Sequence, residues 1–200
     1  MGARRRSREL AMQALFYMDS RQLFGPRYVA LFCDSCPPKA HEAPLFHHLV
    51  NGVLNLRRHL DLLIEQFSSN WKISRMSCVD RNVIRMAVFE MICCSDIPAK
   101  VSINEAIDIG KKFGTEESGS FINGILDSIR KARDEGTLDL SAFPALPLGA
   151  EAPLLNTPEE ADPESEPGAT VDQDTMEAVI PKRPLRVNPK VMKRTRTNSA

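Results

Sequence analysis

The 200-residue chain has little of the alternating pattern that marks β-strands, and it has no long apolar run. Its longer segments repeat apolar residues at a spacing of three or four, which is the period of a helix. No stretch approaches the roughly 18 apolar residues that a membrane-spanning helix needs. After the basic start, Gln, Asp, Ser and Arg interrupt the apolar residues, unlike the core of a signal peptide. We therefore expect a cytoplasmic, all-α protein that does not associate with a membrane.

The common catalytic motifs are also missing. The chain contains no nucleophile elbow, no P-loop, no dinucleotide-binding fingerprint and no HExxH. The glycines of GTEESG flank an acidic pair, so that segment is a poor phosphate cradle and a better helix start. The sequence predicts no enzymatic activity and no cofactor.

The cysteines offer one alternative to this view. Cys33 and Cys36 form a CxxC with three histidines downstream, so a zinc site is conceivable. A tetrahedral structural site needs a second well-spaced pair of ligands, whereas the other three cysteines lie on or beside a helix with a core pattern. We expect free thiols and no bound metal.

Periodicity, prolines and capping residues predict about seven helices. Pro44 suits the first turn of a helix. Ser102 and Glu105 match a capping box, and Thr115 can cap the last helix. The expected helices span residues 4–21, 27–32, 44–56, 59–67, 78–94, 102–113 and 116–133.

The segment 137–200 has a different composition. Residues 151–180 hold nine acidic and no basic side chains, and residues 181–200 hold seven basic and no acidic ones. Blocks of like charge repel themselves, and a segment rich in Pro and acids buries too little apolar surface to offset the entropy of ordering. We expect a folded domain over residues 1–136 and a disordered tail over 137–200.

The first expected helix combines arginines with an aromatic side chain. Arg4, Arg5, Arg6 and Arg8 fall within five positions, and Phe16 follows on the same helix. Guanidinium groups bind phosphates, and aromatic rings stack on bases. Positive charge at a helix N-terminus opposes the helix dipole, which argues against a purely local role. The pattern favours RNA binding, in which the amide of Gln13 could contact a base edge.

Three blocks of the sequence resemble the NusB family of transcription antitermination factors. They are RRRSRELAMQALF at the start, VDRNVIRMAVFEM in the centre, and DIPAKVSINEAIDIGKKFGTEESGSFINGILDSI towards the end. The resemblance covers about residues 4–133. It implies a NusB-like fold of two packed helical bundles, with no catalysis and no cofactor.

The resemblance also implies partners and a function. NusB proteins bind the boxA element of nascent RNA together with the small-subunit ribosomal protein NusE, and so help RNA polymerase to avoid premature termination on ribosomal RNA operons. A homodimer that covers the RNA surface is compatible with this family.

The family's RNA-binding positions map onto two segments. The first holds Arg4, Arg5, Arg6, Arg8, Gln13 and Phe16, and the second holds Glu117, Ser118 and Phe121. Phe121 also has the spacing of a core residue. Asp80 is our candidate for the partner surface.

Two alternatives remain at this point. The first is a protein-binding helical adaptor without RNA, in which the arginines meet an acidic partner. The second is a detached relative of the NusB-like domain that is fused to ribosomal RNA cytosine methyltransferases.

Overall fold

A computed structural model describes residues 2–68 and 71–148, and they form six α-helices and one short 3-10 helix. In chain order these are α1 (Ala3–Arg21), α2 (Pro26–Ser35), α3 (Ala43–Phe67), the 3-10 helix η1 (Ile73–Arg75), α4 (Cys78–Cys93), α5 (Ala99–Phe113) and α6 (Ser118–Asp134). No strand occurs in the described part of the chain, and the predicted all-α fold is confirmed. None of these helices is both long and apolar enough to cross a membrane.

Several helix boundaries differ from the prediction: α2 continues to Ser35, and α6 begins at Ser118 after Glu117 rather than after Thr115. Residues 44–56 and 59–67 belong to the single helix α3, because Arg57 and Arg58 are good helix formers and no Gly or Pro separates the two halves. The helix α5 begins at Ala99, directly after Pro98. Ser102 therefore lies one turn inside the helix, and the predicted capping box does not form.

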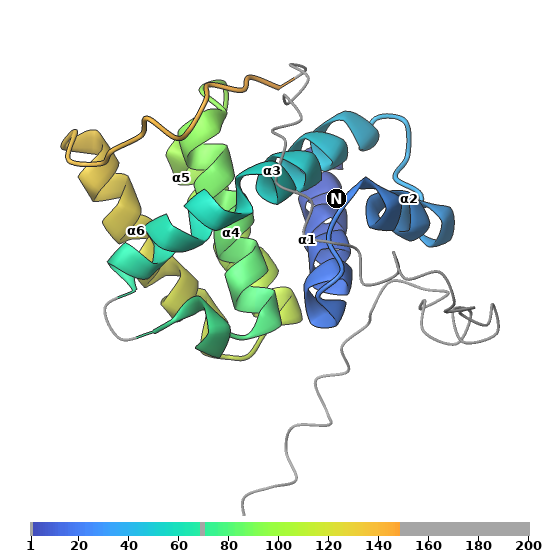
Figure 1. Cartoon of the computed structure of the whole chain (residues 1–200), viewed down its shortest axis with the longest axis horizontal. Coiled ribbons are helices and arrows are strands. Elements are labelled where there is room, and N and C mark those ends of the chain that lie inside the picture. The colour runs from blue at the N-terminus through green and yellow to red at the C-terminus, as the bar shows by residue number, and fades with distance from the viewer. Residues whose placement is uncertain (1, 69–70, 149–200) are drawn as a thin grey trace, which may run out of the picture.

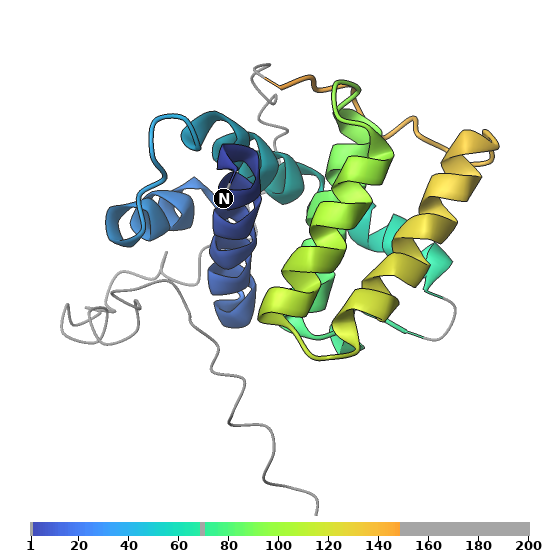
Figure 2. The same ribbon diagram turned by 180° about the vertical axis from the view of Figure 1, so that it is seen from behind.

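The helix α4 lies at the centre of the molecule and contacts α1, α3, α5 and α6. Its sequence explains this position, because a helix that is apolar nearly all round can bury every face. The long helix α3 crosses the others, so that its first half lies with α1 and its end reaches α6 (Figure 1). The same molecule seen from behind shows α1, α5 and α6 across the face away from α3 (Figure 2). The fold thus has the two packed bundles that the resemblance implies.

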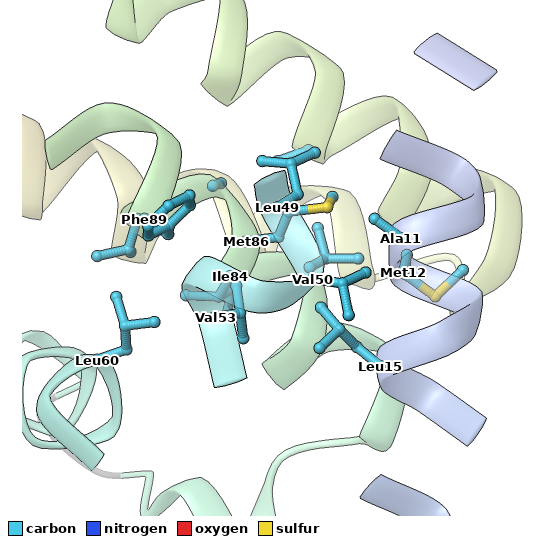
Figure 3. Packing of buried hydrophobic residues seen from close by; sticks show 14 of the residues in the cluster. Ala11, Met12, Leu15, Leu49, Val50, Val53, Leu60, Ile84, Met86 and Phe89 are labelled. Carbon is cyan, nitrogen blue, oxygen red and sulfur yellow. The ribbon is translucent and has the colours of Figure 1, made fainter. Parts of the chain in front are cut away.

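The core between α1, α3 and α4 is packed closely enough to require a glycine. Leu15, Leu49 and Ile84 point into it from these three helices (Figure 3). A Cβ atom at Gly52 would overlap the ring of Phe89, which is fully buried. The helices α3 and α4 can approach this closely because position 52 carries no side chain.

The chain after α6 corrects one expectation. Residues 137–148 are not a disordered tail, because they return across the molecule and pack on it. The backbone N–H of Leu146 donates to the carbonyl of Cys93 over 2.8 Å, and the Leu146 side chain is buried. Phe143 lies against His59, with ring centroids 6.3 Å apart. The acidic and basic blocks at 151–180 and 181–200 lie outside the described residues.

Candidate nucleic-acid interface

The arginines at the start of α1 divide between the surface and the interior. Arg4 is exposed, and no ion pair to it occurs in residues 2–68 and 71–148. Arg5 and Arg6 are half-buried. Arg8 is buried, and its guanidinium contacts Glu90 of α4 through Nε at 2.9 Å and Nη2 at 2.8 Å. Arg8 thus joins α1 to α4 and is not on the surface where we expected it.

A row of ion pairs links α1 to α5. Arg5 donates to Asp108 over 2.8 Å and lies 3.7 Å from Glu105. The hydrogen bond from Arg5 to Asp108 raises the pKa of the arginine further above its ordinary value, against the smaller opposing effect of burial. The buried carboxylate of Glu9 accepts from Lys112 over 2.7 Å. Arg5 is therefore held by acidic partners, whereas the guanidinium of Arg4 is available to a ligand.

The other two predicted contacts on α1 are less accessible. Gln13 is buried, and its amide donates to the backbone carbonyl of Glu9 over 3.1 Å. Phe16 is half-buried and packs against the hydrophobic core. Part of the Phe16 ring can still meet a ligand, but Gln13 is already engaged by its own helix.

The second predicted segment lies at the start of α6. Glu117 is exposed, whereas Ser118 is buried and its hydroxyl accepts the backbone N–H of Thr115 over 2.9 Å. Phe121 is half-buried, and its ring lies edge-on to Trp71. Sequence reasoning missed Trp71 because it stands in a connection between helices without a basic run; its being the only Trp in the chain is the signal that could have identified it.

The two predicted segments are separated on the molecule. The first turn of α1 is at the top in both views, and the first turn of α6 is at the bottom (Figures 1 and 2). The pairs between Arg5 and Asp108 and between Glu9 and Lys112 run between them along α1 and α5. A ligand that touched both segments would have to follow this face.

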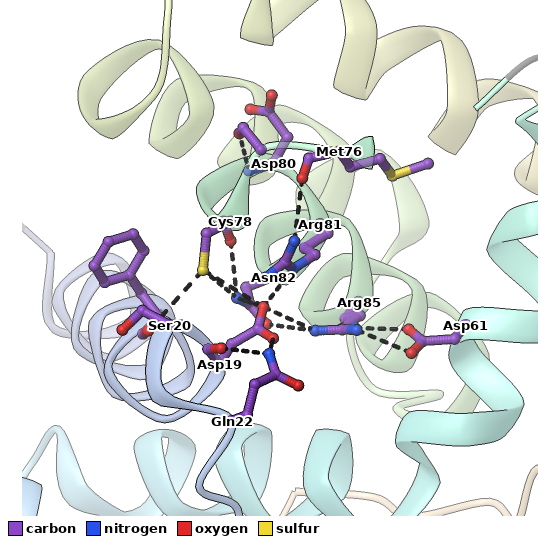
Figure 4. Close-up of polar contacts among 12 residues, drawn as sticks. Asp19, Ser20, Gln22, Asp61, Met76, Cys78, Asp80, Arg81, Asn82 and Arg85 are labelled. Atoms are coloured by element: carbon purple, nitrogen blue, oxygen red, sulfur yellow. Dashed lines mark hydrogen bonds and ion pairs between the residues drawn. The ribbon is translucent and has the colours of Figure 1, made fainter. Parts of the chain in front are cut away.

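The other end of α1 forms a buried polar network with α4 (Figure 4). The Oδ2 atom of Asp19 accepts from Arg81 at 2.5 Å, Asn82 at 2.7 Å and Arg85 at 3.2 Å. Arg85 also forms two hydrogen bonds with Asp61 of α3, at 2.6 and 2.9 Å. Burial alone would raise the pKa of Asp19, but these donors and their charges lower it overall. The network joins three helices and is occupied by its own partners.

Asp80, the candidate for the partner surface, lies in the first turn of α4. Its backbone N–H donates to the Ser77 hydroxyl over 3.0 Å, which caps the helix. The side chain is mostly buried, and its Oδ1 atom has no hydrogen-bond partner in the described part of the chain. The role of Asp80 at a partner surface stays a prediction.

The cysteines and histidines form no recognisable catalytic or metal centre in the described residues. No group of three or more His, Cys, Asp or Glu residues there could hold a metal ion. The ring of His48 lies 3.2 Å from the Cys94 sulfur, and both are buried. Burial raises the pKa of Cys94 to about 12, so its thiol is protonated at neutral pH and is a weak nucleophile.

The helical fold and the exposed basic start of α1 are typical of a small helical binding protein. Comparison with known proteins gives the family. The model of the NusB family matches residues 5–131, and the chain belongs to that family.

Two curated relatives, both named transcription antitermination protein NusB, illustrate the similarity. The protein from Desulfatibacillum aliphaticivorans is 57% identical over 129 residues, which is 64% of this chain and 90% of the relative. That from Desulforapulum autotrophicum is 53% identical over 132 residues, which is 65% of this chain and 92% of the relative. The family resemblance found in the sequence is therefore confirmed.

Solved structures agree with this assignment. NusB from T. maritima is 35% identical and superposes with a TM-score of 0.59 over 68% of this chain and 97% of its own. A structure described as antitermination factors NusB and NusE in complex with double-stranded RNA is 27% identical, with a TM-score of 0.59 over 66% of this chain and 98% of that one.

Proposed function

We propose that this protein binds boxA RNA of nascent ribosomal RNA transcripts together with ribosomal protein NusE, and so suppresses premature termination by RNA polymerase. The observation that carries the proposal is the family match over residues 5–131, which includes Arg5, Arg6 and Arg8 of α1. A related NusB structure is described in complex with NusE and RNA, which supports the same partners. The protein acts in the cytoplasm as a binding factor rather than as an enzyme.

The exposed part of the arginine cluster supplies the first contact in this proposal. Arg4 has no competing ion pair in the described residues, and Arg6 has only a long contact of 3.5 Å to Glu9. Phosphate groups can therefore reach both guanidinium groups at little cost. Arg8 acts indirectly, because its contact with Glu90 holds α1 against α4. The Gln13 amide is bonded within α1 and is not available to the RNA. Phe16 offers part of an aromatic face further along α1.

The test is a fluorescence-anisotropy titration of labelled boxA and scrambled RNA with the full chain, with and without NusE, at two salt concentrations. We expect tighter binding to boxA that strengthens with NusE. Replacing Arg4 and Arg6 by Ala should weaken binding and lower the slope of log affinity against log salt by about 0.7 for each lost phosphate contact.

The matched control is Arg58→Ala, which removes the same charge from an exposed site on α3. It should leave the slope unchanged. Equal and weak binding to both RNAs, with or without NusE, would contradict the proposal. A ribonuclease-insensitive complex with a protein would then favour the helical adaptor, and methyl transfer to ribosomal RNA by the purified chain would show an enzyme instead.

A further inference from the structure

Trp71 is a large aromatic side chain left on the surface. Its exposed fraction is 51%, and in the described residues only Leu62 and Val101 are other large hydrophobic side chains with comparable exposure. Trp is enriched at binding interfaces, because its ring offers a large apolar face and its N–H a polar contact. Trp71 is therefore a candidate for a binding contact.

Hydrogen bonds tie the backbone at Trp71 and Ile73 to the end of α3. The N–H of Trp71 donates to the carbonyl of Ser68 over 2.6 Å, and the Ser68 hydroxyl donates to the carbonyl of Trp71 over 2.7 Å. Two residues later, the N–H of Ile73 donates to the Glu65 carboxylate over 2.9 Å. These bonds tie the connection to the end of α3 and reduce the entropy that a ligand must remove on binding.

Phe121 supports the indole from α6. The two ring centroids are 6.0 Å apart, and the ring planes are inclined by 73°, which is an edge-to-face arrangement. Phe121 packs against the core on its other side. Trp71 thus contacts Phe121 on one side, and about half of the residue, 51%, stays accessible to a partner.

The charges beside Trp71 favour an anionic partner. Lys72 and Arg75 follow it in the chain and are exposed. No ion pair to Arg75 occurs in the described residues, and Lys72 has only a loose contact, 3.7 Å from Glu65. Glu117 lies one turn before Phe121, so a phosphate would avoid the α6 side and lie beside Lys72 and Arg75.

The geometry points to a base-stacking site at Trp71, in which one unpaired base of a bound RNA stacks on the exposed indole face while Lys72 and Arg75 neutralise its flanking phosphates. We call these three residues, with Phe121 as support, the Trp71 platform. The inference rests on the proposed RNA-binding function and adds a contact that the basic start of α1 does not supply. An apolar protein partner fits less well, because the neighbouring exposed residues Lys72, Ser74, Arg75 and Ser77 are all polar or charged.

The single Trp of the chain makes the test direct. Intrinsic fluorescence of the full chain is followed while unlabelled boxA RNA and a scrambled RNA of the same length are added. Stacking on the indole should quench the emission in parallel with the anisotropy change of labelled RNA. Trp71→Ala should weaken RNA binding on the order of tenfold, and Trp71→Phe should restore most of the loss because it keeps a stacking face.

One control and one further test separate the platform from general effects. Val101→Ala removes exposed apolar surface at the start of α5 and should not change RNA affinity. Lys72→Gln with Arg75→Gln should lower the salt slope, by about 0.7 for each lost phosphate contact. Circular-dichroism melts should show the same cooperative unfolding for each variant, because all four positions are exposed.

The experiment also distinguishes failure of the Trp71 platform from failure of the proposed function. If the wild-type chain binds boxA RNA but its emission does not change and Trp71→Ala binds equally well, the platform is wrong and the proposed function stands. If the chain binds no RNA even with NusE, both are wrong. Quenching by NusE alone, or by raising the concentration of the chain alone, would assign Trp71 to a protein interface and overturn the platform.

Discussion

Arginine side chains at the two ends of α1 have different surroundings. At the start of the helix Arg4 is exposed, without an ion pair in the described residues. At its end, Arg81 and Arg85 of α4 close around the buried carboxylate of Asp19. The surface arginine keeps its donors available for a phosphate, whereas the donors of the other two are used within the protein. The same residue type is therefore exposed in one region and joins helices in the other, and the difference comes from burial and from the acidic partners within reach.

The largest effect should follow from breaking the Asp19 network. Asp19→Ala leaves donors of Arg81, Asn82 and Arg85 without their shared acceptor, and we expect a loss of about 4 kcal/mol in the free energy of unfolding. Urea denaturation followed by circular dichroism measures this. At temperatures where the variant is folded, its RNA affinity should equal that of the wild-type chain. A variant as stable as the wild type would show that the network contributes little.

A paired substitution on one helix contrasts the two roles of arginine directly. Arg8→Met should cost about 3 kcal/mol of stability, because the Glu90 carboxylate remains buried without its partner. Arg4→Met should change stability by less than about 0.5 kcal/mol, because the side chain is exposed. RNA affinity should show the opposite order among the folded molecules. Equal melting temperatures for Arg8→Met and Arg4→Met would contradict this assignment of roles.

A smaller effect should appear in the pH dependence of stability. Because the folded-state pKa of Asp19 lies below its ordinary value, the carboxylate contributes stability that is fully present well above that value. This contribution is lost as the pH falls through the lower, folded-state pKa. The difference in unfolding free energy between the wild type and Asp19→Asn should therefore be constant near neutral pH and shrink below about pH 4. A constant difference down to pH 2 would contradict this assignment.

Much of the fold follows from local patterns in the chain. Apolar spacing predicted α1 and α4 to within one residue at each end, because each buries a long apolar surface. Pro26 and Pro44 lie in the first turns of α2 and α3. The wrong helix predictions lie where the sequence pattern is compatible with either a continuous helix or a break. A break in α3 was predicted where the charged pair of Arg57 and Arg58 simply lies within a continuous helix.

The packing of residues 137–148 was the larger error. Their Pro-rich composition is typical of disorder, and it gives no sign that Leu146 enters the core beside Cys93 and hydrogen-bonds to the α4 backbone. The Leu146 backbone also hydrogen-bonds to His48, although burial is the larger effect and lowers the pKa of that ring overall. Leu146, Cys93 and His48 come from three segments that are far apart in the chain. The composition of one segment therefore does not predict that the three come together.

The candidate site was predicted from residue types at the start of the chain, and its role stays a prediction. The spacing along the helix could have indicated that Arg8 is buried, because Arg8 shares a face with Ala11, Leu15 and Met18. No local sequence pattern predicts that Glu90 contacts Arg8 or that Trp71 contacts Phe121, because the two pairs are 82 and 50 positions apart in the chain.

The sequence by itself determined that this protein is all-helical, that it belongs with the NusB proteins, and that its first helix begins with a cluster of positive charge. These properties depend on residue type and on spacing within single helices, which the chain displays directly. Only the tertiary structure decided which arginines remain exposed, which ones are paired with acidic residues inside the protein, and which aromatic ring stays exposed. Those outcomes depend on solvent exclusion and on partners from distant segments, and both come into being only when the helices pack together.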